Sequence, residues 1–277
     1  MMTQLLKLGE REYRALPGLS GSELVHLAQS PAHLITARKE GRVETKPMRI
    51  GTLAHCMTLE GMQVFNERFR PAMPCAEVFG PKTKKAGQTC GKFFCGIHGE
   101  GKEDDYEYSP AEAMEAQRIR DAIFRNPDAG LILSRGKPEV VLVGHNRKGK
   151  IDWLSDLKME GNRMMGDLKT VNSNDFQDWS PGVKELLQAG HYLNLGEDCE
   201  EVGPCSWFWI VAESSEPNSV FFYILDPEDQ ADAQAADRSL QRIYDDCVLN
   251  NEFPPPMPPM QYAKIKPYTK TKIRELR

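Results

Sequence analysis

Residues 137–170 read KPEVVLVGHNRKGKIDWLSDLKMEGNRMMGDLKT, and this stretch decides the fold. Three of its segments are expected to be strands: Glu139–Val143, Lys150–Leu154 and Arg163–Val171. The first is rich in β-branched residues, which pack well on the pleated surface of a sheet. Polar segments that contain glycine, His145–Gly149 and Met159–Asn162, separate the three strands and are typical of hairpin turns. The stretch therefore predicts consecutive strands joined by short turns.

Two carboxylates and a lysine come together if the second and third of these strands pair. Side chains alternate across a strand, so Asp167 and Lys169 share one face while Leu168 points to the other. A hairpin return can place Asp152 beside Asp167. Mg²⁺ suits such a place, because it takes one or two carboxylates together with phosphate oxygens. The two aspartates would hold the ion, and the Leu168 carbonyl could add a ligand. Lys169 would lie near the attacking water and the charge that develops on the phosphate.

A D-x-K tripeptide is weak support by itself, because it is common on solvated surfaces. Asp156-Leu-Lys158 is a second example within the same stretch. We favour Asp167-Leu-Lys169 because a hairpin return separates it from Asp152. Asp156, in contrast, lies on the strand of Asp152 or just past its end.

Four segments, in order, resemble a known family. Ile-Asp152 followed by Gly-Asp167-Leu-Lys169 resembles the D…(D/E)-x-K signature of the PD-(D/E)XK nuclease superfamily, in its RecB-like subgroup. Three more segments resemble those of RecE-like (exonuclease VIII) phage and prophage exodeoxyribonucleases: LSGSEL…SPAH over residues 19–33, GTLAH…LE over residues 51–60, and QAGHY over residues 188–192. The ordered set spans roughly residues 17–255 and is far more specific than any one member.

The resemblance implies a restriction-endonuclease-like α/β core, with a mixed central sheet of about five strands flanked by helices. It also implies a magnesium-dependent, 5′-to-3′ double-strand DNA exonuclease that leaves 3′ overhangs, with Mn²⁺ expected to substitute for Mg²⁺. The implied partners are double-stranded DNA ends, a single-strand annealing recombinase and further copies of the chain in a ring. The implied setting is the cytoplasm of a bacterium that carries a phage or prophage.

The resemblance extends the site beyond the strands. His55 lies beside the apolar stripe of a predicted helix, Arg49–Glu60, where a lone histidine is usually a hydrogen-bonded core residue. The resemblance instead makes it a metal ligand or phosphate contact beside Asp152. Glu139 could reach a second ion, or it could simply occupy a strand end, and both readings stay open.

Gln188 and Tyr192 are four residues apart in a predicted helix, Pro181–Leu195, and so share a face. They are either a polar surface pair or, as the resemblance implies, DNA contacts near the cleaved bond. Three lysines form a basic cluster that is expected to be solvated or to contact phosphate: Lys82, Lys84 and Lys85.

Composition sets the limits of this reading. The chain has 277 residues, 40% of them hydrophobic, which suffices for one large α/β domain or two small ones. No apolar run approaches the ~20 residues of a membrane span, and the N-terminus lacks a signal-peptide h-region. Seven cysteines without paired spacing indicate free thiols in a reducing cytosol. We expect a nuclease domain with an N-terminal helical part over residues 1–253, then a proline-rich linker and basic tail over residues 254–277.

The net charge of −5 does not exclude DNA binding, because local clusters of basic residues matter more than the total. The last 14 residues, from Lys264, hold six Lys or Arg against one Glu. This tail is expected to hold DNA or to keep the protein soluble.

Two rival readings belong to other classes. One is a DNA-binding or assembly protein that keeps the fold without the chemistry, and the intact Asp152, Asp167 and Lys169 speak against it. The other is a zinc-stabilised interaction module built on Cys90-x4-Cys95-x2-His98. A structural zinc site needs four ligands, usually with closer cysteine pairs, so Cys75 would have to be the fourth.

Helix N-cap residues and the spacing of apolar residues predict the remaining helices and strands. Ser20 and Ser109 each begin a helix with Glu three residues later, the spacing of a capping box. A late, long helix is expected to bury Ala236, Leu240, Ile243, Tyr244 and Cys247. Two apolar strands are expected at Cys205–Glu213 and Ser219–Leu225.

Overall fold

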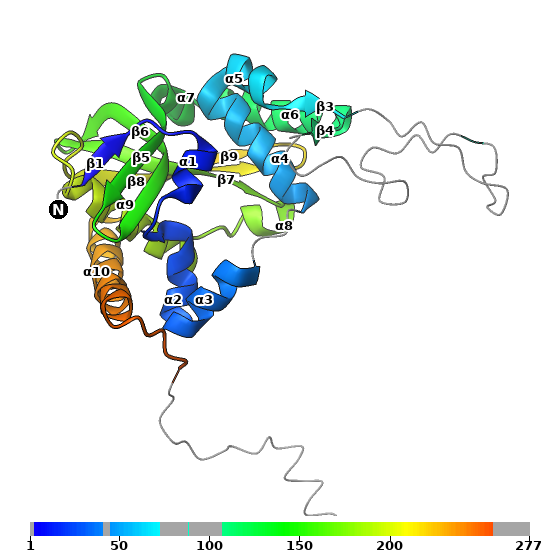
Figure 1. Cartoon of the computed structure of the whole chain (residues 1–277). Coiled ribbons are helices and arrows are strands. Elements are labelled where there is room, and N and C mark those ends of the chain that lie inside the picture. The colour runs from blue at the N-terminus through cyan, green and yellow to red at the C-terminus, as the bar shows by residue number, and fades with distance from the viewer. Residues whose placement is uncertain (1–2, 41–44, 73–87, 89–106, 257–277) are drawn as a thin grey trace, which may run out of the picture.

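A seven-stranded mixed sheet forms the centre of the computed structural model, which describes residues 3–40, 45–72, 88 and 107–256 (Figure 1). The strand order is β1-β5-β6-β7-β8-β9, and β2 pairs with β6 in parallel. All other neighbours are antiparallel except β7 and β8. The strands are β1 (Gln4–Leu6), β2 (Leu19–Ser20), β5 (Gly136–Gly144), β6 (Arg147–Met159), β7 (Asn162–Val171), β8 (Cys205–Glu213) and β9 (Val220–Ile224). A two-stranded sheet pairs β3 (Arg70–Pro71) with β4 (Glu107–Tyr108).

The predicted α/β class, with a mixed sheet flanked by helices, is confirmed. The expected strand number, about five, was too low because β1 and β2 contain only three and two residues. The turns are also shorter than expected. Only His145 and Asn146 separate β5 from β6, and only Glu160 and Gly161 separate β6 from β7. Asn146, Glu160 and Gly161 have φ values of 53°, 51° and 89°, the left-handed conformation that tight hairpin turns favour.

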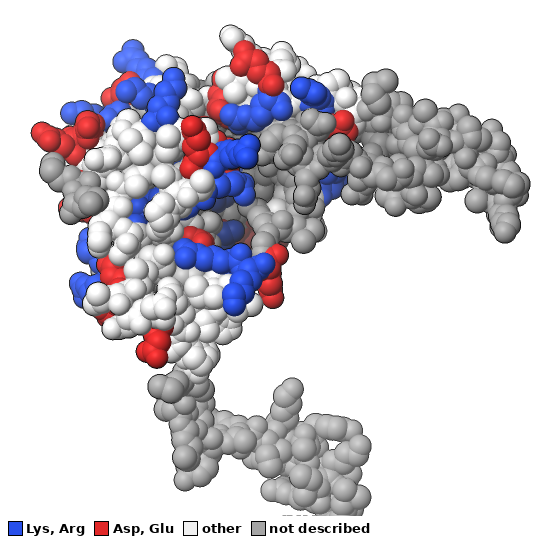
Figure 2. Space-filling view, viewed as in Figure 1, with Lys and Arg blue, Asp and Glu red and all other residues white. Residues whose placement is uncertain are grey.

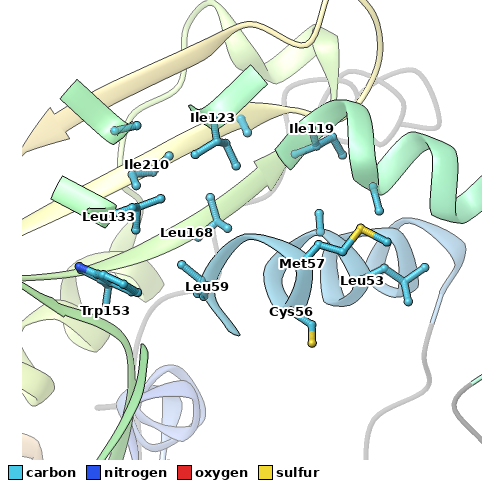
Figure 3. Close-up of a cluster of buried hydrophobic side chains, with 14 of the residues drawn as sticks. Leu53, Cys56, Met57, Leu59, Ile119, Ile123, Leu133, Trp153, Leu168 and Ile210 are labelled. Carbon is cyan, nitrogen blue, oxygen red and sulfur yellow. The ribbon is translucent and has the colours of Figure 1, made fainter. Parts of the chain in front are cut away.

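One face of the sheet is covered by helices that lie between β2 and β5 in sequence. They are α4 (Lys46–His55), the π-helix η2 (Cys56–Glu60), α5 (Gly61–Arg68), α6 (Pro110–Arg125) and α7 (Pro127–Leu133). Leu53 and Met57 face Ile119 and Ile123 of α6, close to the strand that carries Leu168 (Figure 3). Burying each such side chain contributes about 1.5–3 kcal/mol. This core fixes α4 against the sheet.

The other face is covered by α9 (Val183–Glu197), and α10 (Pro227–Asn250) packs outside α9. The two helices approach closely at Gly190, where a Cβ would lie only 2.2 Å from the Ala233 carbonyl oxygen. The short elements α1 (Glu10–Ala15), η1 (Gly21–Glu23), α2 (Leu24–Gln29), α3 (Pro31–Glu40) and α8 (Ser173–Phe176) complete the fold.

The stripe expected on the long helix was wrong in two positions. Ala236 is exposed and Ile243 is 44% exposed, while Asp237 is completely buried. Asp237 accepts hydrogen bonds from Arg147 Nη2 at 2.6 Å and Asn194 Nδ2 at 2.7 Å, and its Oδ1 lies 2.8 Å from His191 Nδ1. A buried ion-pair network, not an apolar side chain, thus joins α10, α9 and the start of β6. Val183, at the start of α9, is 67% exposed.

Within the described part of the chain, no helix has the length and apolar character needed to cross a bilayer.

Candidate active site

The candidate site lies on one edge of β6, between two strands that pair there at different places. β7 pairs with β6 as far as Trp153 and Gly166, whereas β2 pairs with β6 at Arg147 and Lys148. β5 pairs along the opposite edge of β6 from Arg147 to Ser155, except at Asp152. In the described structure no ladder pair joins residues 149–152 to a strand on the β2–β7 side. Polar side chains at this position can therefore reach solvent and a substrate.

Asp152 and Asp167 occupy the point where β6 and β7 part, one step beyond the last paired residues. Asp152 Oδ2 accepts the Leu168 backbone N–H at 2.8 Å and lies 2.7 Å from His55 Nε2. The structure thus brings the two predicted strands and His55 together. The Leu168 side chain is buried in the core, so only the main chain of this residue reaches the site.

Asp167 and Lys169 form the second half of the site. Lys169 Nζ lies 2.7 Å from Asp167 Oδ2 and donates to Gln188 Oε1 at 3.1 Å. Gln188 Nε2 donates to Asp167 Oδ1 at 3.1 Å, so its amide bridges the carboxylate and the ammonium. Among the described residues, the buried Asp167 Oδ2 receives no hydrogen bond of good geometry. An oxygen of this kind is available to a further cation.

Burial and charge move the pKa values of these groups in different directions. Burial raises the pKa of Asp167 to about 6, although the charge of Lys169 acts to lower it. Burial alone would also raise the pKa of Asp152, but His55 and the Leu168 N–H lower it below its usual value. For His55, burial lowers the pKa, but the charges of Asp152, Glu139 and Asp167 prevail and raise it to about 9. The site concentrates negative charge, as a cation site does.

Glu139 extends the acidic cluster onto β5. Its Oε1 lies 3.8 Å from His55 Nδ1, and its other oxygen forms an ion pair with Lys150. Glu139 has a φ of 52° in the middle of a strand, a left-handed conformation that costs about 1–3 kcal/mol in a residue other than glycine. This kink interrupts the regular β5–β6 ladder at the place where the acidic side chain meets the site.

His55 reaches the sheet because α4 lies very close to β7. A Cβ on Gly51 would stand 2.8 Å from the Thr170 hydroxyl oxygen, so only glycine fits there without a shift. His55 follows one turn later, at the point where the α-helix passes into the π-helix η2. The apolar face predicted for this helix is confirmed, since Ile50, Leu53 and Met57 are buried. A π-helical turn often occurs at functional sites.

A divalent cation would find its ligands on this cluster. His55, Glu139 and Asp152 each offer one ligand atom, and these atoms lie within 4.8 Å of one another. Asp167 lies outside this group, and its Oδ2 is 2.7 Å from Lys169 Nζ. Carboxylates suit Mg²⁺ and Mn²⁺, and the imidazole makes the set better suited to Mn²⁺ than oxygen ligands alone would be. The residues present therefore fit a divalent ion.

The other predicted residues take different positions. Tyr192 is only 5% exposed, and its hydroxyl lies 3.4 Å from Gln188 Nε2. Asp156, of the rival D-x-K, lies on β6 itself, is exposed and forms an ion pair with Arg163 at 2.8 Å. The basic cluster, the candidate zinc ligands and the C-terminal tail lie outside the described residues: Lys82, Lys84, Lys85, Cys75, Cys90, Cys95, His98 and residues 264–277.

Sequence reasoning missed two charged residues beside the site. Lys150 is bound by both Glu139 and Glu10, which comes from α1. The position of Lys150 two residues before Asp152 on one strand was a usable signal, because it puts both on the same face. Nothing local in the sequence points to Glu10, which is 140 residues away from Lys150.

Comparisons with known proteins agree with the fold. A family model described as a PDDEXK-like domain of unknown function (DUF3799) matches residues 20–262. A crystal structure described as a "Putative exonuclease" from Eubacterium rectale has a TM-score of 0.57 and 15% sequence identity, and the match covers 96% of this chain and 98% of that one. At this identity the likeness shows the fold alone. No curated protein matches the sequence.

Proposed function

The chain belongs to the PDDEXK-like domain family, and on this premise we propose that the protein is a metal-dependent nuclease that hydrolyses phosphodiester bonds in DNA. One observation carries the proposal. Asp152, Asp167 and Lys169 meet where β6 and β7 part, with His55 brought to Asp152 by α4. Two carboxylates, an imidazole and an ammonium in one place serve phosphoryl chemistry better than they serve stability.

The proposed roles follow from the contacts. Asp152, Asp167 and His55 would hold Mg²⁺ or Mn²⁺, and Glu139 would complete that site or serve a second ion. A divalent cation there lowers the pKa of a bound water and offsets phosphate charge. Lys169 stabilises the negative charge that develops during hydrolysis. Gln188 holds Lys169 and Asp167 in place through its amide.

We further propose the finer activity that the motifs suggest, a RecE-like 5′-to-3′ exonuclease acting on double-stranded ends. Its support is that the motif segments, distant in sequence, gather at one place. A Cβ on Gly21 of η1 would lie 3.3 Å from Gln188 Cγ and 3.0 Å from the Tyr192 ring. The N-terminal segment therefore packs against α9, whose Gln188 contacts both Asp167 and Lys169. An annealing recombinase and a ring of copies are part of this proposal.

A digestion assay tests the function. Linear duplex DNA labelled at either the 5′ or the 3′ end is incubated with the wild-type chain and with Lys169→Ala, in Mg²⁺, in Mn²⁺ and in EDTA. We expect metal-dependent degradation by the wild type alone, and loss of the 5′ label first. Loss of the 3′ label first would contradict the polarity only. A folded wild type that binds DNA but leaves it intact in both metals would make the protein a binding protein with a nuclease fold.

A further inference from the structure

Basic side chains form a cluster on the same edge of β6 as the candidate active site, but away from Asp152 and Asp167. Arg14 of α1, Arg38 of α3 and Lys148 of β6 line a pocket together with Glu23 and the chain segment Leu16–Gly18. Figure 2 shows a hollow near the middle of the drawn face, with Lys and Arg side chains around it and some Asp and Glu among them. Three cations from three elements thus face one carboxylate.

The main-chain wall of this pocket is held in place by the cations themselves. Lys148 is only 9% exposed, and its Nζ donates to the carbonyls of Tyr13, Arg14 and Leu16 at 3.4, 3.3 and 2.5 Å. Gly18 has a φ of 109°, and a Cβ there would lie 2.9 Å from the Arg147 nitrogen. The wall is therefore formed before any ligand arrives, which lowers the entropic cost of binding.

The two arginines keep hydrogen-bond donors for a ligand. A guanidinium has five N–H groups. Arg38 donates to Glu23, to the Gly18 carbonyl and to the Tyr244 hydroxyl, so three hydrogen bonds leave two N–H groups. Arg14 donates to Glu10 through Nε, and its side chain is 73% exposed. Free guanidinium N–H groups in a basic pocket match the oxygens of a phosphate.

The distance between the pocket and the candidate site fits a nucleic-acid strand. Lys148 and Asp152 are four residues apart on β6, which is about 13 Å along a strand. Because a strand also winds around the duplex axis, neighbouring phosphates lie farther apart than the axial rise of about 3.4 Å, and one strand can reach both places within a few nucleotides.

We propose that Arg14 and Arg38, in the pocket whose main-chain wall Lys148 holds in place, bind an internucleotide phosphate of the DNA strand that is cleaved, a few nucleotides from the cleaved bond. The proposal rests on the proposed nuclease function and adds a residue-level account of how an acidic chain holds its substrate. The pocket anchors the strand, and the carboxylate site cuts it.

Duplex binding across a salt series tests the pocket. The probe is a fluorescent blunt duplex with 5′-hydroxyl ends, so that every phosphate it offers is internucleotide, and binding is measured by anisotropy in Ca²⁺. Removing the side chain that neutralises one phosphate is expected to flatten the slope of log affinity against log salt by about 0.9. Because the two arginines are proposed to bind the same phosphate, we expect the full change in the double variant, and a change no larger than this in Arg14→Ala and in Arg38→Ala. Arg38→Lys should recover part of it.

Arg118→Ala is the matched control. Arg118 is an arginine of α6 that is 51% exposed and pairs with the exposed Glu216. Its removal should leave the slope unchanged. Wild-type slopes in folded Arg14→Ala and Arg38→Ala would overturn the pocket. If Arg38→Ala fails to fold, the exposed Arg14→Glu decides alone, since a wild-type slope there refutes the proposal. A wild type that cleaves DNA while these variants keep its slope disproves the pocket only, whereas a wild type that neither binds nor cleaves disproves the nuclease too.

Discussion

At the scale of the residue, the site depends on a buried carboxylate oxygen, Asp167 Oδ2, that has a cation beside it but no hydrogen bond of good geometry. On the proposed function, Asp167→Ala and Lys169→Ala are each expected to lower metal-dependent DNA cleavage by on the order of 10²-fold or more, because they would remove a proposed metal ligand or the charge proposed to stabilise the reacting phosphate. Initial rates on labelled duplex give the comparison, with circular dichroism to show that each variant is folded. Asp156→Ala is the control, since Asp156 pairs with Arg163 at the surface. An inactive Asp156→Ala beside an active Asp167→Ala would move the site to the other D-x-K.

Gln188 could contact DNA or position Asp167 and Lys169, and the sequence alone could not distinguish these two roles. The motif suggested a DNA contact, whereas the structure shows its amide bound to both Asp167 and Lys169. If Gln188 positions these groups, Gln188→Ala should lower kcat and leave DNA affinity in Ca²⁺ near the wild-type value. A direct phosphate contact would instead weaken binding and flatten the salt slope by about 0.9. Single-turnover cleavage and anisotropy on the same duplex decide between the two, and Gln188→Glu tests whether the amide N–H groups are needed.

At the scale of the element, α10 supports the site through α9. Asp237 lies among Arg147, His191 and Asn194, and His191 Nε2 in turn lies 3.1 Å from the Lys148 carbonyl oxygen. Removing one partner of a buried ion pair typically costs about 3–5 kcal/mol, because the other charge stays buried. We therefore expect Asp237→Ala to lower the free energy of unfolding in urea by about that amount. A change below about 1 kcal/mol, the scale of an ordinary surface pair, would show that the network contributes little.

The same residue gives a pH dependence with a definite sign. Burial alone would raise the pKa of Asp237, but His191, Arg147 and Asn194 lower it below its usual value. A carboxyl whose pKa is lower in the folded chain stabilises the fold above its unfolded pKa, about 3.9, and this contribution disappears as the pH falls through the folded pKa. The stability difference between wild type and Asp237→Asn should therefore be constant near neutral pH and shrink below about pH 4. Urea unfolding at several pH values measures it, and a difference that grows on acidification would contradict the assignment.

At the scale of the whole molecule, what the sequence predicts well is local. Asp152 and Asp167 are joined by one hairpin, so strand alternation and turn signals suffice to bring them together. Asp237 escaped prediction because its partners, Arg147 and His191, lie 90 and 46 residues away. The helical period correctly selected Tyr244 and Cys247, but it favoured Ala236 over Asp237 because an aspartate reads as a surface residue unless its partners are known. Glu10, which reaches Lys150 from α1, was missed for the same reason.

The whole chain carries a net charge of −5, so its affinity for DNA has to come from local basic groups. The segment from Lys264 to Arg277 holds six of these against one glutamate and contains no candidate ligand of the site. We expect deletion of residues 264–277 to weaken duplex binding and to flatten the salt slope by about 0.9 for each phosphate that the tail neutralises, while the single-turnover cleavage rate of bound DNA is kept. A variant of full length with the six Lys and Arg changed to Gln separates charge from chain length, because only the removal of charge changes counterion release. If tail and pocket act independently, the slope changes of the deletion and of Arg14→Ala should add in the combined variant. A wild-type slope in the deletion would make the tail a solubility feature and leave the pocket and the metal site to hold the DNA.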